Sequence, residues 1–290
     1  DGAVREARDR IRAAIRNAGF EFPLERLLIN LAPASMKKGG SSFDLSMALA
    51  VLHASGQLPD FGSAILAMGE LELSGRVRPV PGVLPATAAA VSAGIGAVLV
   101  ARENLAEARV LAGDRAFSLS DLGGALTLAA SVRSVLDRSP QTLELSSAIA
   151  RKPLTRTLGS AEPDMADLRG QAKLRRALEI SAAGGHHLLI FGPPGSGKTM
   201  AARRLAGIMP LLDDDDAVTL TTLHSLAGFS PGDDGLIWQP PFRAPHHGAS
   251  AEGIVGGGRA RRPGEISLAH GGVLFLDEAP EFRVDVLQAL

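Results

Sequence analysis

Apolar residues recur at helical spacing at the start of the chain. Val4, Ala7, Ile11 and Ile15 lie three or four positions apart with arginines between them, and Gly19 follows as a helix stop. The opening segment is therefore expected to form one amphipathic helix.

Short apolar runs alternate with helical stretches over the next hundred residues. We expect helices at residues 44–54, 85–93, 103–112 and 121–130, and strands at residues 26–31, 64–73, 77–80 and 97–101. A turn at Ser74 and Gly75 joins the second strand to the third. Strands and helices mixed in this order predict an α+β or α/β domain.

The periodicity weakens between residues 131 and 165, where prolines and scattered charges interrupt it. A chain of 290 residues is long enough for two domains with separate cores. We therefore predict a first domain at residues 1–130, a linker at residues 131–165 and a second domain at residues 166–290. Helical spacing returns at Leu174, and a glycine pair at Gly184 and Gly185 ends it.

A phosphate-binding motif follows this helix. Residues 187–191 are a compact apolar run that predicts a strand, and a second helical pattern starts at Met200. Between them stand Gly192, Pro193, Pro194, Gly195, Ser196, Gly197, Lys198 and Thr199. Strand, glycine-rich loop and helix in this order are typical of a P-loop, which binds ATP. Its glycines let backbone N–H groups surround the phosphates, Lys198 neutralises the β and γ oxygens, and Thr199 gives a hydroxyl to Mg²⁺.

A second apolar run, at residues 273–276, delivers two adjacent carboxylates. Ligands gather at the carboxyl ends of strands in parallel sheets. We expect Asp277 to hold the hydration shell of Mg²⁺ and Glu278 to polarise the water that attacks the γ-phosphate.

Two further groups lie between these motifs. His246 and His247 are adjacent, so on an extended segment they point to opposite faces, and no third ligand stands at a convincing spacing; polar packing or loop contacts are favoured over a metal site. Arg259, Arg261 and Arg262 make a cationic, glycine-rich loop. That loop either contacts a nucleic-acid backbone or is simply solvated, and both interpretations stay open.

Composition narrows the class of protein. Hydrophobic residues make up 46% and charged residues 21% of the chain, with a net charge of -1, as in a globular protein without a global basic field. The absence of cysteine excludes disulfides and zinc–thiolate sites and fits a reducing cytoplasm. The sequence has no apolar run of membrane-spanning length, so no membrane association is expected. Because it starts with Asp1 and stops within a helical pattern at residues 284–290, we expect an excerpt of a longer protein.

The second domain resembles the AAA+ ATPases of the magnesium-chelatase-like group, and specifically the ComM/YifB-type proteins. The resembling segments are residues 167–171, 242–250, 263–270 and 272–282. The first domain resembles the Lon-protease-like domain of ribosomal protein S5 domain 2-type fold that precedes the ATPase in that family. Here the segments are residues 19–23, 30–34, 42–45 and 69–75. The implied fold class is α/β: an α+β Lon-like domain, then a P-loop AAA+ domain with an incomplete parallel sheet.

The resemblance implies a cytoplasmic homo-hexamer that uses ATP and Mg²⁺ to move DNA, in branch migration or unwinding during recombination and natural transformation. It also implies that the sensor, the lid and the neighbour's arginine lie beyond residue 290, so that this stretch alone is incomplete for hydrolysis. Alternatives are a magnesium-chelatase motor subunit, an ATP-dependent Lon-like peptidase and a non-catalytic scaffold.

The peptidase alternative meets a specific objection. Ser42 falls where the Lon nucleophile would fall, and a serine needs a base. The partner lysine is missing, because residues 83–88 contain none. We therefore expect Ser42 to be a helix N-cap or a loop residue.

Overall fold

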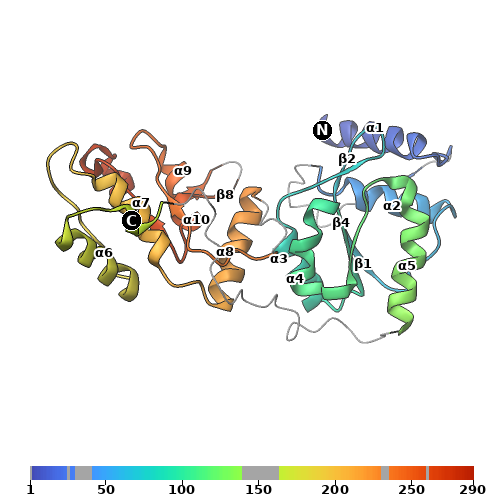
Figure 1. Cartoon of the computed structure of the whole chain (residues 1–290). Coiled ribbons are helices and arrows are strands. Elements are labelled where there is room, and N and C mark those ends of the chain that lie inside the picture. Colours follow the sequence, from blue (N-terminus) through green and yellow to red (C-terminus); the bar gives the residue numbers. More distant parts are fainter. Residues whose placement is uncertain (1, 25–26, 30–40, 139–162, 230–234, 259–260) are drawn as a thin grey trace. The chain divides into compact units, whose positions relative to one another are not determined.

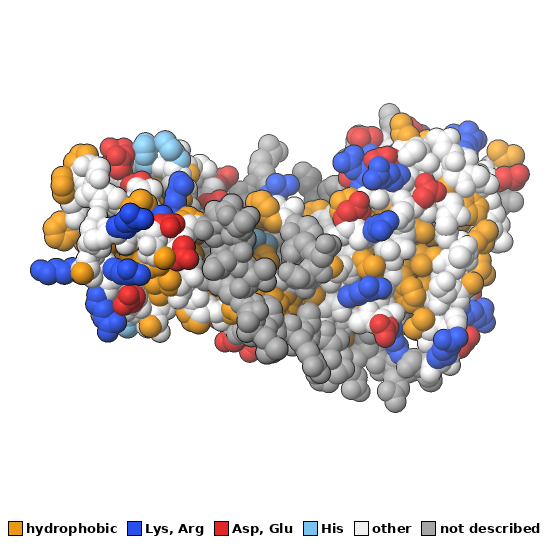
Figure 2. Space-filling view, viewed as in Figure 1, with side chains coloured by type: hydrophobic (Ala, Val, Ile, Leu, Met, Phe, Trp, Pro, Cys, Tyr) orange, Lys and Arg blue, Asp and Glu red, His pale blue; other side chains and the backbone are white. Residues whose placement is uncertain are grey.

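The structure is a computed structural model that describes residues 2–24, 27–29, 41–138, 163–229, 235–258 and 261–290. The chain divides into two compact units, one made of Asp1–Ala150 with Gly228–Gly235 and the other of Arg151–Ala227 with Leu236–Leu290. The boundaries predicted from the sequence for the two domains and their linker remain predictions. Basic and acidic side chains are interspersed over the visible face of each unit (Figure 2).

A parallel sheet forms the centre of the first unit. Its strands are β1 (Ile65–Met68), β4 (Ala97–Val100) and β5 (Ala116–Ser118), in the order β1-β4-β5. All four residues of β4 are buried. A central strand of a parallel sheet is covered on both faces, which is why β4 consists only of alanine, valine and leucine.

Helices cover both faces of this sheet (Figure 1). The helices α1 (Gly2–Asn17), α2 (Asp44–Ala54) and α5 (Ala125–Arg138) pack in one core with Leu99, whereas α3 (Val83–Ser92) and α4 (Leu105–Ala112) pack in another with Val98 and Val100. Successive residues of a strand point to opposite faces, so β4 contributes to both cores. The short 3₁₀ helices are η1 (Arg102–Asn104), η2 (Gly113–Arg115) and η3 (Leu122–Gly124).

A small hairpin of β2 (Glu70–Leu71) and β3 (Val77–Arg78) follows β1. Its antiparallel strands flank the turn at Ser74 and Gly75 that the sequence predicts. The expected strand at residues 64–73 is divided at Gly69, whose N–H donates to Ser42 O (3.1 Å) instead of continuing one ladder. A Cβ on Gly69 would lie 2.6 Å from Val77 Cγ1, so the site needs glycine. Within the expected strand at residues 26–31, the described residues 27–29 form no strand, and residues 26, 30 and 31 lie outside the described residues.

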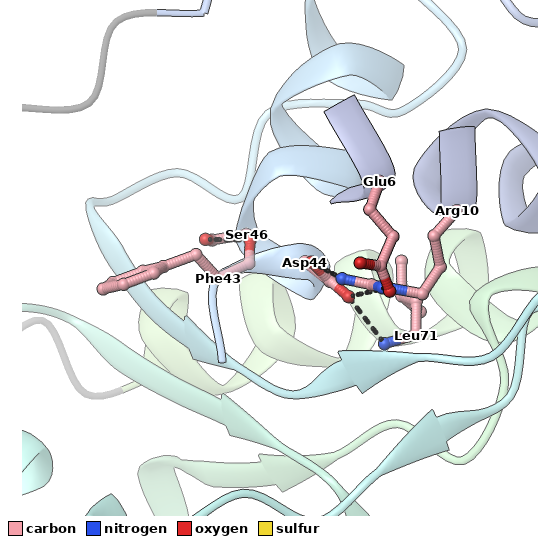
Figure 3. A network of polar contacts seen from close by, with 6 residues as sticks. All are labelled: Glu6, Arg10, Phe43, Asp44, Ser46 and Leu71. Atoms are coloured by element: carbon pink, nitrogen blue, oxygen red, sulfur yellow. Dashed lines mark hydrogen bonds and ion pairs between the residues drawn. The ribbon is translucent and has the colours of Figure 1, made fainter. Parts of the chain in front are cut away.

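An ion pair fastens α1 to α2 (Figure 3). Arg10 donates from Nε to Asp44 Oδ2 (2.6 Å) and from Nη2 to Asp44 Oδ1 (3.3 Å), and Asp44 Oδ2 also accepts from the backbone N–H of Leu71 (3.4 Å). Asp44 is fully buried. The hydrogen bond to Asp44 raises the pKa of Arg10 above its usual value. Glu6 adds an exposed contact to Arg10. The Asp44 carboxylate thus joins α1, α2 and strand β2.

The second unit contains helices and two short strand pairs. The helices are η4 (Met165–Asp167), α6 (Ala172–Gly184), α7 (Lys198–Ile208), α8 (Asp214–Ala227), α9 (Ala251–Val255), α10 (Glu265–Leu268), η5 (Ala279–Glu281) and α11 (Val284–Leu287). Strand β6 (Phe242–Arg243) runs parallel to β9 (Val273–Leu274), and β7 (Gly256–Gly257) runs antiparallel to β8 (Arg262–Pro263). Both units therefore mix helices with parallel strands, which confirms the α/β class.

A further local expectation was wrong. Residues 187–191 form no strand; within the described residues they have no ladder partner, and Leu189 and Phe191 are exposed, because an apolar run needs a hydrogen-bonded neighbour to become a strand. The acidic run at residues 213–216 starts α8: Asp213 Oδ1 accepts from the N–H of Asp216 (2.8 Å), and carboxylates are favourable at a helix N-terminus. Of the two roles expected for Ser42, the structure shows the loop residue: the residue before α2 is Phe43, and Ser42 lies in the preceding turn.

The described helices include none that is both long enough and apolar enough to cross a bilayer.

Candidate functional site

The glycine-rich loop leads directly into α7. Gly195 and Gly197 have φ of 76° and 82°, a left-handed conformation that other residues rarely adopt, and Gly197 is the N-cap of α7. This places Lys198 and Thr199 in the first turn of the helix, where N–H groups lack partners within the helix. The loop sequence thus sets both the turn and the position of the helix start.

Two side chains hold the loop. The Lys198 ammonium donates to the carbonyl oxygens of Gly192 (2.9 Å) and Pro193 (3.0 Å). Gln171 donates from Nε2 to Ser196 O (2.9 Å), although it lies just before α6. Gln171 itself has φ of 51°, unusual for a residue with a side chain. The sequence marks this glutamine only through the family resemblance of residues 167–171, and gives it no role.

A long-range hydrogen bond joins the two predicted motifs. Thr199 Oγ1 donates to Asp277 Oδ2 over 2.9 Å, although the residues are 78 positions apart. The expected strand at residues 273–276 forms only in part, because β9 ends at Leu274 and the carboxylates follow in the next turn. A hydroxyl and a carboxylate oxygen at this separation are ligands that Mg²⁺ prefers, so Thr199 and Asp277 fit the ion.

Glu278 lies in a different group of side chains. Its backbone is left-handed, with φ of 53°. One ligand atom each from His247, Glu278 and Glu281 lie within 4.8 Å of one another. Asp277 contacts Thr199, so the two adjacent carboxylates belong to two clusters. Sequence spacing favoured loop contacts over a metal site for His247, because its neighbours in this cluster stand more than thirty positions away in the sequence and are brought near only by the fold.

A bidentate ion pair supports the same region. Arg243 of β6 donates from Nε and Nη2 to the two carboxylate oxygens of Glu265 (2.6 and 2.7 Å), at the start of α10. This hydrogen bonding raises the pKa of Arg243 above its usual value. The pair ties α10 to the strand beside β9. No local signal in the sequence connects these two residues.

The predicted cationic loop is the turn between β7 and β8. Arg262 is exposed in β8, and Arg261 is exposed in the turn with φ of 48°. Arg259 lies outside the described residues. The structure thus places two of the three arginines on one hairpin.

Comparison with known proteins covers both units. A family model described as magnesium chelatase, subunit ChlI, matches residues 164–290, and one described as subunit ChlI of Mg-chelatase matches residues 1–104. The chain is 44% identical over 291 residues to the protein YifB of Salmonella typhimurium, and 41% identical over 289 residues to the competence protein ComM of Haemophilus influenzae. Each alignment covers 99% of this chain but only 54% of YifB and 55% of ComM, so the chain spans about half the length of these relatives.

A partial similarity points to a third protein. Lon protease 2 of Bacillus subtilis is 33% identical over 128 residues, which are 40% of this chain and 22% of that protein. The two family matches and the identities across almost the whole chain agree with the segments quoted from the sequence. The chain belongs to the magnesium-chelatase-like family that includes YifB and ComM.

Proposed function

We propose that the chain contributes the ATP-binding and water-activating residues of an AAA+ motor that acts on DNA. Magnesium-chelatase-like AAA+ proteins generally use ATP and Mg²⁺. The observation that carries the proposal is the hydrogen bond from Thr199 to Asp277, since it joins a glycine-rich loop to an acidic segment as a nucleotide site requires.

Each residue of the site has a separate task. Lys198, whose ammonium donates to two loop carbonyls, would donate instead to phosphate oxygens of ATP. Thr199 and Asp277 would hold Mg²⁺, which supplies positive charge against the phosphate oxygens. The carboxylate of Glu278 would accept the proton of the attacking water. The loop from Gly192 to Gly197 would contribute backbone N–H groups to the phosphates.

We further propose that the first unit is a Lon-like domain of S5 type that has no peptidase activity. The similarity to part of Lon protease 2 supports the resemblance. Helix α3, where the partner lysine is expected, contains none. Ser42 O accepts from the N–H of Gly69, which ties this segment to the sheet as a structural turn.

DNA is the proposed substrate because of the relatives and the β7–β8 hairpin. The relative from Haemophilus influenzae is a competence protein by its name. Exposed arginines such as Arg261 and Arg262 are suited to phosphate contacts, and Arg259 belongs to the same loop. We propose a cytoplasmic homo-hexamer, in which a ring of such hairpins would surround one strand or duplex.

A second candidate is a magnesium-chelatase motor subunit. Both family models carry that description, which is the observation in its favour. A chelatase motor would be stimulated by its porphyrin-loaded partner and would be indifferent to DNA. The two proposals therefore differ in the macromolecule that raises the rate of ATP hydrolysis.

The test is ATP hydrolysis by the full-length protein, measured with and without branched DNA, for the wild type and for Lys198→Ala. The DNA proposal expects stimulation that Lys198→Ala abolishes while DNA binding persists. Hydrolysis that branched DNA leaves unchanged, together with no DNA binding, would reject the DNA motor. Degradation of casein that depends on Ser42 would reverse the conclusion about the first unit.

A further inference from the structure

Three metal-ligating side chains meet beside the site described above. His247 belongs to the loop after β6, Glu278 precedes η5, and Glu281 is the last residue of η5. One ligand atom from each lies within 4.8 Å of the other two. The fold thus brings an imidazole to two carboxylates from a different part of the sequence.

The backbone fixes the two carboxylates relative to each other. The N–H of Glu281 donates to Glu278 O over 2.8 Å, which closes a 3₁₀ turn. Pro280 lies inside this turn and restricts its backbone. Glu278 is the left-handed N-cap of η5 and Glu281 its last residue, and this short turn keeps their carboxylates within 4.8 Å of each other. Little conformational freedom of the backbone remains to be lost on binding.

The histidine is positioned by the buried ring of Phe282. Its ring contacts the edge of Phe282, with 6.4 Å between ring centroids, and lies 4.0 Å from the ring of His246. Phe282 is buried in a small core with Ile254 and Val286, so it anchors the imidazole to α9 and α11. Locked ligand rotamers are the condition for a preorganised metal site.

The separation of one pair of ligand atoms fits a small tetrahedral ion. His247 Nε2 lies 3.6 Å from Glu281 Oε2. Two ligands about 2.0–2.2 Å from a tetrahedral Zn²⁺ are about 3.4 Å apart. The observed distance is therefore close to one edge of the coordination tetrahedron without movement of the backbone.

The chemistry of the ligands favours zinc over magnesium. Mg²⁺ demands oxygen ligands and near-octahedral geometry, whereas Zn²⁺ binds an imidazole nitrogen and carboxylate oxygens readily. Two carboxylates balance the charge of a divalent ion. Because His247 is partly exposed and both carboxylates are exposed, an ion can enter and keep a fourth position for water.

We propose that His247, Glu278 and Glu281 form a binding site for Zn²⁺ or a similar borderline divalent cation, and that occupancy inhibits ATP hydrolysis. The second half rests on the function proposed above, in which the Glu278 carboxylate accepts a proton from water. A carboxylate that coordinates zinc has lost that basicity. Asp277 is directed to Thr199, so nucleotide and Mg²⁺ binding continue while the site is occupied.

The first experiment measures binding without nucleotide. Co²⁺ is titrated into the metal-free chain, its visible absorption reports tetrahedral coordination, and Zn²⁺ is then added to displace it. His247→Ala and Glu281→Gln are each expected to weaken binding at least about ten-fold, since each removes one of three ligands. His246→Ala is the matched control, because its Nδ1 accepts from the N–H of Gly248 and its ring is not one of the three ligands. Circular dichroism checks that each variant is folded.

The site is supported when the wild type and His246→Ala bind Co²⁺ saturably with tetrahedral absorption. His247→Ala and Glu281→Gln must then abolish this binding. Weak binding of equal strength in all four proteins, or the same loss in His246→Ala, overturns it. These results do not depend on ATPase activity.

The second experiment measures zinc inhibition of the full-length ATPase, each protein being normalised to its own zinc-free rate. The proposal expects inhibition in the wild type and in His246→Ala, and at least about ten-fold lower zinc sensitivity in Glu281→Gln. Equal zinc sensitivity in Glu281→Gln and the wild type contradicts the inhibitory role. A protein that binds zinc but has no ATPase would instead refute the function proposed above and leave the metal site supported.

Discussion

The ion pair between Arg10 and Asp44 allows a quantitative test of how the first unit is held together. Asp44→Asn keeps the shape of the side chain but removes the negative charge that pairs with Arg10. Breaking a buried pair costs about 3–5 kcal/mol because it leaves one group uncompensated. Arg10 retains 18% side-chain exposure, so solvent screening lowers our expectation to about 2–4 kcal/mol of unfolding free energy.

The reciprocal variant, Arg10→Met, leaves the fully buried carboxylate of Asp44 without its cation, and a similar loss is expected. In the double variant neither charge is buried without a partner. We therefore expect the double variant to lose at least about 1.5 kcal/mol less than the sum of the single losses.

The assay is urea unfolding followed by far-ultraviolet circular dichroism. A loss of about 3 kcal/mol moves the unfolding midpoint by about 1–2 M urea. Trp238 is the only tryptophan and is buried in the second unit, so its fluorescence follows that unit separately. Single variants that leave the circular-dichroism midpoint unchanged, or losses that add fully in the double variant, would refute the coupling between these two residues.

Four further predictions concern the second unit. Thr199→Val should weaken Mg²⁺-dependent nucleotide binding about ten-fold, or about 1.4 kcal/mol, whereas Thr199→Ser should restore it; calorimetry of both variants checks this. Arg243→Lys should destabilise the unit by about 1–2 kcal/mol in Trp238 fluorescence, because lysine cannot make the bidentate pair across to α10, and an unchanged midpoint would show the pair to be dispensable. Gly264→Ala should destabilise it by about 2 kcal/mol or more in the same assay, because a Cβ there would overlap backbone atoms of α9 and β7, and a wild-type midpoint would contradict that packing. Arg262→Ala should reduce the slope of log affinity for DNA against log salt by about 1 in filter binding, and an unaltered slope would exclude a phosphate contact.

Features carried by adjacent residues could be predicted from the sequence. The P-loop depends on eight consecutive residues, and the left-handed Gly195 and Gly197 are where the motif needs them. The buried strand β4 was expected at residues 97–101, because a short run of alanine, valine and leucine is typical of a strand covered on both faces. The hairpin turn at Ser74 and Gly75 follows equally from local turn chemistry.

Features that require distant segments to meet could not be predicted. The cluster of His247, Glu278 and Glu281 depends on where the loop after β6 lies relative to η5, which spacing does not encode. Gln171 contacts the P-loop through the fold, and a glutamine before a helix carries no local signal of it. The strand expected at residues 187–191 failed for the same reason, since its formation depends on neighbours that an apolar pattern cannot specify.

The most direct test of the proposed function is the rate of ATP hydrolysis by the full-length Glu278→Gln variant, with and without branched DNA. Glutamine keeps the size of the side chain but cannot accept the proton, so hydrolysis should fall at least about a hundred-fold while ATP binding stays near the wild-type level. Wild-type hydrolysis should rise with branched DNA. A Glu278→Gln protein that hydrolyses ATP at the wild-type rate, or a wild type that neither binds branched DNA nor responds to it, would contradict the account.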